Sequence, residues 1–127
     1  MKLKPILFIL FIINIVLFNY GCKKNVPYSK VAPSIYGTNW VRNYPAFTIQ
    51  LVFNYDDTYS FIKAGKVYES GTYTTSYSSL TLQTTEGDCN GIPAAYNYVI
   101  ADAKIIFLIS KDSCTDRSNE LKGTWIK

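Results

Sequence analysis

The chain has 127 residues, of which 48% are hydrophobic and 16% are aromatic, and its formal net charge is +4. This length provides for one domain with one hydrophobic core. The chain has three cysteines and no histidine, which excludes every catalytic mechanism that depends on an imidazole. No glycine-rich phosphate loop follows a predicted strand either, so we expect no enzyme.

The first 21 residues follow the order of a secretory signal peptide. Lys2 and Lys4 precede residues 6–18, an apolar run in which Asn14 is the only polar side chain. Thirteen residues in a helix extend only about 20 Å, which is too short for a bilayer core of about 30 Å. The segment therefore predicts export rather than a membrane span.

The residues after the apolar run resemble a processing site. Gly21-Cys22 followed by Lys23-Lys24 is similar to the lipobox of bacterial lipoproteins, although Asn19 stands where an aliphatic residue is usual. The resemblance implies cleavage before Cys22 by signal peptidase II and a lipid on that cysteine. The alternative is a plain secreted protein with a free thiol at residue 22.

Cysteine arithmetic favours lipidation independently. An exported chain with three cysteines keeps one reactive thiol unless one cysteine is modified. With Cys22 lipidated, Cys89 and Cys114 remain as a pair in a compartment where disulfides persist, and we expect them to form one. Two cysteines without histidine make a poor zinc site, so we expect neither a metal nor another cofactor.

The positive charge is concentrated near the start of the chain. Residues 22–33 contain Lys23, Lys24 and Lys30 together with Pro27 and Pro33, and they predict an extended tether. Residues 34–127 hold eight lysines and arginines against nine aspartates and glutamates. This balance removes the electrostatic basis for nucleic-acid binding.

Residues 34–127 predict one all-β domain. Apolar and polar residues alternate, as in residues 47–54, and turn residues recur about every ten positions. The predicted strands are residues 36–42, 47–54, 59–63, 67–74, 79–84, 96–100, 104–110 and 120–127. Eight strands joined in sequence by short loops predict an up-and-down antiparallel barrel, which has no free edges, and a two-sheet β-sandwich is the alternative.

The strand pattern also predicts what occupies the barrel. The loops after the fifth and seventh strands lie at the same end, as a Cys89–Cys114 bridge requires. The inward candidates are nearly all large, so we expect a largely filled interior with at most a shallow mouth. They are Phe47, Ile49, Leu51, Phe53, Tyr59, Phe61, Tyr73, Leu80, Leu82, Tyr96, Tyr98, Ile100, Ile105, Phe107, Ile109, Leu121 and Trp125. Ile106 and Leu108 fall on the outer face, where they make a small apolar strip.

Short motifs at both ends of the domain resemble a known family. The first strand holds Gly37-Thr38-Asn39-Trp40, and the last part of the chain holds Cys114, Arg117 and Trp125. These motifs are similar to lipocalins and, more closely, to the lipocalin-like domains of Bacteroidetes lipoproteins, although lipocalins have one residue fewer between the glycine and the tryptophan. The resemblance implies that Arg117 packs over Trp40 and that Trp40, Arg117 and Trp125 close the barrel.

These features together predict a non-catalytic, exported protein that a lipid on Cys22 anchors to the outer membrane of a Gram-negative bacterium. The periplasmic face is favoured, because Lys23-Lys24 lacks the acidic residues of the surface-export signal of Bacteroidetes lipoproteins. Two functions remain open. The barrel is an interaction module for another envelope protein, or it carries or senses a small apolar ligand in its mouth. A filled interior weakens the second.

Overall fold

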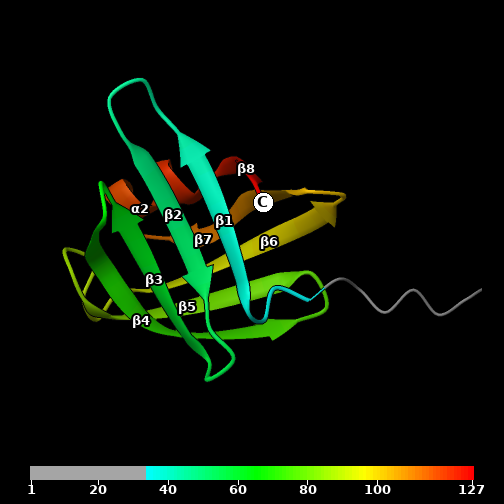
Figure 1. Ribbon diagram of the computed structural model, residues 1–127. Helices are drawn as coiled ribbons and strands as arrows, with labels where there is room; N and C mark the ends of the chain where they lie inside the picture. The colour runs from blue at the N-terminus through cyan, green and yellow to red at the C-terminus, as the bar shows by residue number, and fades with distance from the viewer. Residues whose placement is uncertain (1–33) are drawn as a thin grey trace, which may run out of the picture. The chain divides into compact units, whose positions relative to one another are not determined.

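The computed structural model describes residues 34–127. The predicted signal peptide, Cys22 and the predicted tether lie outside the described residues. Residues 34–127 form one closed barrel of eight antiparallel strands in chain order, as Figure 1 shows. The strands are β1 (Thr38–Asn43), β2 (Thr48–Phe53), β3 (Thr58–Lys63), β4 (Lys66–Ser76), β5 (Ser79–Glu86), β6 (Pro93–Ala101), β7 (Lys104–Asp112) and β8 (Gly123–Ile126). The predicted barrel is therefore confirmed, and the sandwich is not formed.

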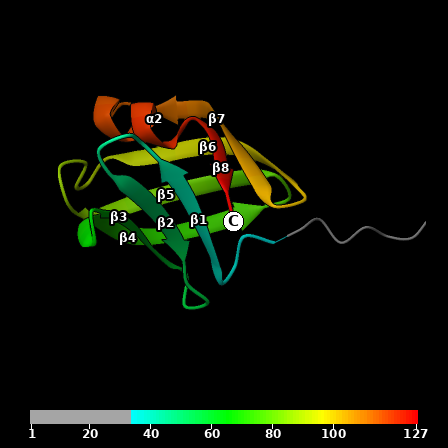
Figure 2. The ribbon, with the colours of Figure 1, turned by 45° about the horizontal axis from the view of Figure 1, so that its top comes forward.

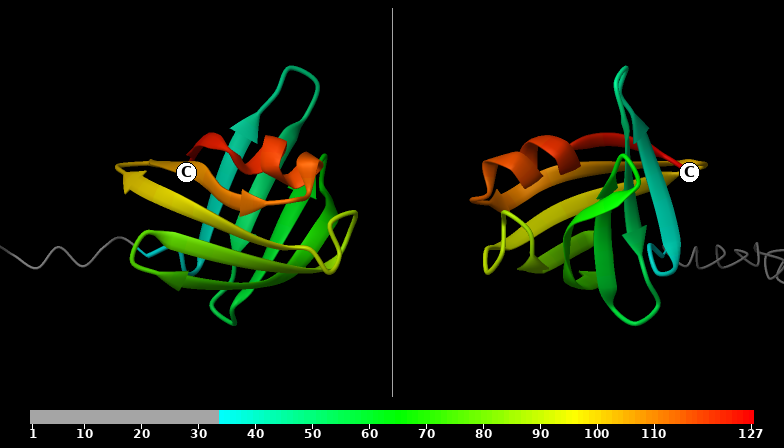
Figure 3. Two further views of the ribbon diagram at one scale, coloured as in Figure 1. Left: turned by 180° about the vertical axis from the view of Figure 1, so that it is seen from behind. Right: turned by 60° about the vertical axis from the view of Figure 1, so that its left-hand side comes forward.

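Consecutive strands pair with each other, and the barrel closes where Val41 of β1 pairs with Ile126 of β8. We call the end where residue 34 leads into β1 the N-terminal end; it also holds the β2–β3, β4–β5 and β6–β7 turns. The opposite end carries the helix α2 (Thr115–Leu121) between β7 and β8, and we call it the helix end (Figures 2 and 3). Among the described residues no helix is long and apolar enough to cross a membrane.

The barrel interior is filled by the side chains that alternate inward along the strands. The core comprises 17 buried residues, nine of them aromatic. Fourteen of the predicted inward residues belong to this core, whereas Phe47 and Ile100 are only partly buried. Ile109 is 43% exposed, and β7 carries a bulge directly after it: Tyr96 pairs with Ile109, but Ala95 pairs with Lys111. The extra residue shifts the phase of every later side chain on β7.

The end of the chain differs from the sequence prediction. Residues 120 and 121, which were expected to begin the last strand, are the last residues of α2, and β8 begins at Gly123. A helix of seven residues completes only about two turns. Such a segment is too short to show the repeating apolar period by which helices are predicted.

Candidate functional site

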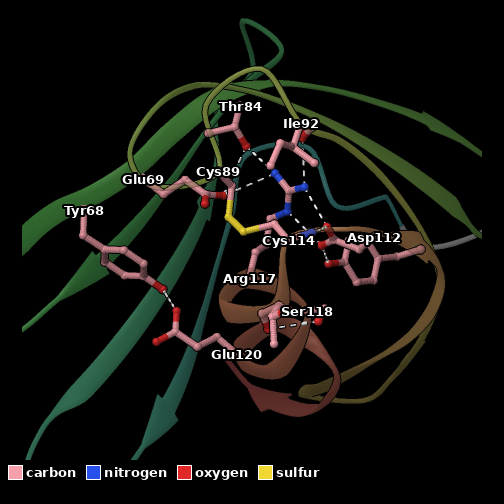
Figure 4. Close-up of a disulfide and its surroundings, with 12 residues drawn as sticks. Tyr68, Glu69, Thr84, Cys89, Ile92, Asp112, Cys114, Arg117, Ser118 and Glu120 are labelled. Atoms are coloured by element: carbon pink, nitrogen blue, oxygen red, sulfur yellow. Dashed lines mark hydrogen bonds and ion pairs between the residues drawn. A yellow bond between two sulfur atoms is a disulfide. The ribbon is translucent and has the colours of Figure 1, made fainter.

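A buried ionic network at the helix end is built around Arg117, on the inner side of α2 (Figure 4). The Arg117 guanidinium binds both carboxylate oxygens of Asp112: Nε donates to Oδ2 and Nη2 to Oδ1, each at 2.8 Å. Nη2 also donates to the Ile92 carbonyl at 2.9 Å, and Nη1 donates to the Thr84 hydroxyl. The side chains of Arg117 and Asp112 are fully shielded from solvent.

A second carboxylate completes the network from the other side. Glu69 of β4 is buried, and its Oε1 lies 3.9 Å from Nη1 of Arg117. The Tyr59 hydroxyl donates to the same oxygen at 2.9 Å, and the Thr84 hydroxyl does so at 3.3 Å. Among the described residues, no buried side-chain nitrogen or oxygen lacks a hydrogen-bond partner. A fully satisfied network of this kind fixes one arrangement of the elements that carry it.

The bulge in β7 is what brings Asp112 to Arg117. Upstream of it the odd-numbered Ile105 and Phe107 face inward, and downstream the even-numbered Asp112 does, opposite the buried Ala94. The Tyr96 hydroxyl donates to Oδ2 of Asp112, and the Cys114 backbone N–H donates to Oδ1 at 2.8 Å. The sequence pattern did not predict an inward Asp112, because alternation alone does not reveal a bulge.

The pKa values of the two carboxylates around Arg117 are shifted in opposite directions. Burial raises the pKa of Asp112, but hydrogen bonds from Arg117, Tyr96 and the Cys114 N–H outweigh burial, and the net pKa is lowered. Burial also raises the pKa of Glu69, and there the hydrogen bonds from Tyr59 and Thr84 and the charge of Arg117 do not compensate for it. Arg117 therefore forms its strong ion pair with Asp112, and Glu69 is the less stabilised anion.

Cys89 and Cys114 form the predicted disulfide, with their Cα atoms 5.8 Å apart. Cys89 lies in the loop between β5 and β6, and Cys114 is the N-cap residue of α2. The bridge therefore ties the start of α2 to a neighbouring loop at the helix end, beside the Arg117 network (Figure 4).

The residues expected to close the barrel are all buried, but they pair differently from the expectation. Arg117 does not pack over Trp40, because its guanidinium is held by Asp112 and Thr84. The charge near Trp40 is that of Lys127, whose Nζ lies 5.9 Å from the ring centroid. The arginine that packs on a tryptophan is Arg42 of β1, whose Cζ lies 4.6 Å from the Trp125 ring centroid.

Arg42 also holds the connection between α2 and β8. Its Nη1 donates to the Glu120 carbonyl at 2.6 Å, and its Nη2 donates to the carbonyls of Lys122 and Thr124 at 3.0 and 3.1 Å. Carbonyls at the end of a helix lack intrahelical partners, and this guanidinium supplies them. No sequence signal singled out Arg42, because its partners are backbone atoms of a helix that the pattern did not predict.

A polar groove of about 390 Å³ opens at the helix end. It is lined by Lys63, Tyr68, Asp88, Asp116, Asn119 and Glu120. Within it Glu120 accepts a hydrogen bond from the Tyr68 hydroxyl, and its Oε1 lies 3.6 Å from Nζ of Lys63. The groove thus presents charges of both signs next to a rigidly held helix, an arrangement that suits polar contacts with another molecule.

Two further residues of the network were not among the sequence candidates, although the strand pattern contains a signal for both. Glu69 is in phase with the inward Gly71 and Tyr73 of β4. Thr84 is in phase with the inward Leu80 and Leu82 of β5. A polar residue in the inward phase of a barrel strand indicates a buried partner, because an unpaired polar group there is costly.

No family model, curated protein or solved structure matches the chain. The likeness to lipocalin-like domains therefore rests on the motifs around Trp40 and Trp125. The closed eight-stranded barrel is consistent with that likeness.

Proposed function

We propose that the chain is a non-catalytic, lipid-anchored protein of a Gram-negative cell envelope, whose lipocalin-like barrel contacts another envelope protein at its helix end. The observation that carries this proposal is the filled interior. An eight-stranded barrel has room for its own side chains or for one small ligand. Nine aromatic residues occupy the core, which favours an interaction module over the carriage of an apolar molecule.

The disulfide supports the anchor. The chain has three cysteines, and Cys89 is bonded to Cys114. Cys22 is then the cysteine left over, in the sequence context that resembles a lipobox. A lipid on its thiol accounts for an odd cysteine in an exported chain.

The helix end is the surface that we assign to the partner. Its groove carries Lys63 together with Asp88, Asp116 and Glu120, a mixture typical of the polar rim of a protein interface. The disulfide and the Arg117 network hold α2 before any partner arrives. Binding therefore costs little ordering of the surface, which favours affinity from a modest contact area.

The test is site-specific photo-cross-linking in cells that make the lipidated protein. A photoreactive residue replaces exposed Asn119 in the groove, and the control replaces exposed Thr72 on β4. We expect one defined protein adduct from position 119 and none from position 72, and we expect Asp116→Lys to diminish the adduct severalfold. Equal adducts from both positions, or none from position 119, would contradict the proposal. A stoichiometric apolar molecule released on unfolding would favour the carrier function.

A further inference from the structure

Four apolar side chains form a strip on the outer face of the barrel, away from the helix-end groove. They are Val99 of β6, Ile106 and Leu108 of β7 and Ile126 of β8, and they are 55%, 40%, 57% and 44% exposed. Val99 lies directly opposite Ile106 in the register of β6 and β7. We propose that this strip rests on the phospholipid bilayer that holds the anchor.

The strip includes a groove at the N-terminal end of the barrel. The groove has a volume of about 320 Å³, and Val99, Ile106 and Ile126 line it together with the β6–β7 turn. Lys104 and Lys127 also line it. An apolar surface flanked by amines suits the boundary between acyl chains and anionic headgroups, where lysine side chains keep their charge in water.

This groove lies at the end of the barrel where the chain enters it. Residue 34 leads into β1 at the N-terminal end, where the Lys127 backbone N–H donates to the Ala103 carbonyl at 2.9 Å. Eleven residues separate Cys22 from residue 34, so the chain between the two positions spans at most about 40 Å. The inference rests on the proposed lipid at Cys22, which would hold this end of the barrel close to the bilayer.

The charges of the N-terminal end differ between its two sides. Among the side chains around the groove, Lys104 and Lys127 outnumber Asp102. In a barrel of eight strands β2 and β3 lie opposite β6 and β7, and the β2–β3 turn carries Asp56 and Asp57. An anionic membrane attracts the lysine side and repels the aspartate side, so the barrel tilts onto the strip.

The size of the strip favours a membrane over a protein. Four partly exposed side chains fall far short of the roughly 800 Å² per partner of a stable protein interface. Contact with a bilayer needs less buried area, because the anchor already holds the barrel beside the membrane and makes the second contact intramolecular. The strip therefore suits a contact that orients the protein, whereas recruitment comes from the lipid.

The test uses the mature lipidated protein in vesicles of phosphatidylethanolamine and phosphatidylglycerol. With Cys22 lipidated and Cys89 bonded to Cys114, an introduced cysteine is the free thiol that takes an environment-sensitive fluorophore. We place it at Leu108→Cys and, as the control on the opposite side, at Thr72→Cys. Nitroxide lipids should quench the label at position 108 severalfold more than the label at position 72, and Lys104→Glu with Lys127→Glu should abolish the difference.

Three results would overturn the proposal. Equal quenching at the two positions would place the strip in water. A label at position 108 that leaves water only as the protein density on the vesicles rises would indicate contact with a second copy. A label that leaves water only when an envelope protein is added would indicate contact with that partner. Failure of the anchor is distinguishable, because an unlipidated protein separates from the vesicles on flotation, whereas failure of the strip leaves the protein bound with position 108 exposed.

Discussion

Arg117 is the residue on which the helix end depends. One guanidinium holds Asp112 of β7, Thr84 of β5 and the Ile92 carbonyl, and it faces Glu69 of β4. These partners come from segments far apart in the sequence, so the network fixes their mutual arrangement. A buried pair contributes less than its Coulomb attraction suggests, because both charges lose their hydration. Removing one member, however, leaves the other buried and unpaired.

We therefore expect Arg117→Met to lower the free energy of unfolding by about 3 to 5 kcal/mol. Urea denaturation followed by tryptophan fluorescence measures this change. Lys122→Met, which removes an exposed cation nearby, is the matched control and should change stability by less than about 0.5 kcal/mol. A loss for Arg117→Met no larger than that of the control would show that the network does not stabilise the barrel.

The two carboxylates beside Arg117 should have opposite effects on stability as the pH changes. The pKa of Asp112 is lowered on folding, so ionised Asp112 stabilises the protein above its ordinary pKa of 3.8, and this stabilisation is lost as the pH falls through the folded pKa. The pKa of Glu69 is raised from 4.5 on folding. Neutral Glu69 therefore contributes stability that is fully present below pH 4.5 and is lost as the pH rises through the folded pKa.

Unfolding measured at pH 7 and at acidic pH tests this opposition. At pH 7 we expect Asp112→Asn to be clearly destabilised and Glu69→Gln to be at least as stable as the parent. The difference in stability between each variant and the parent should become smaller in acid, for Asp112→Asn as the pH falls below 3.8 and for Glu69→Gln as it falls below 4.5. Parallel profiles for the two variants would contradict the assignment.

At the scale of elements, α2 is the one that the alternation of the sequence did not reveal. The strands follow from period-two patterns, and Ile49, Leu51 and Phe53 of β2 are buried as the pattern predicts. Three tertiary contacts hold the seven-residue helix: the disulfide at Cys114, the Arg117 network and the contact of Arg42 with its last carbonyls. None of these can be derived from local periodicity, which explains why residues 120 and 121 were predicted as strand.

Removing the disulfide should loosen the start of α2. Cys89 and Cys114 are 25 residues apart, for which the chain-entropy model gives about 3 to 4 kcal/mol. We expect Cys89→Ala with Cys114→Ala to lose that much stability and to exchange the amide hydrogens of α2 faster than those of β2. Reductant should destabilise the parent and leave the double variant unchanged. A double variant as stable as the parent would rule out this role for the bridge.

Arg42 should matter through its shape as well as its charge. Lysine keeps the cation over Trp125, but it cannot bind the carbonyls of Glu120, Lys122 and Thr124 in the same fork. We expect Arg42→Lys to cost about 1 to 2 kcal/mol in denaturant unfolding, and Arg42→Met to cost somewhat more. Equal stability of Arg42→Lys and the parent would show that the carbonyl contacts contribute little.

At the scale of the whole molecule, the sequence indicated the closed barrel and its filled interior, but not how its two ends differ. Alternating strands, the large inward residues and the position of the two cysteines pointed to a closed, filled barrel. The difference between the two ends depends on a bulge in β7 that turns Asp112 inward and on a short helix that brings Arg117 to it. In the proposed function the helix end binds a protein, and in the further inference the β6–β8 side contacts the bilayer.

The anchor is the claim on which this arrangement depends, and the intact mass of the protein extracted from its native membrane tests it most directly. We predict a chain beginning at Cys22 with diacylglyceryl and acyl additions, and a gain of two hydrogens when the Cys89–Cys114 bridge is reduced. The Cys22→Ser variant should lack the additions and leave the membrane fraction. An unlipidated mass for the parent chain would contradict the proposed anchor and would indicate a secreted barrel with a free thiol.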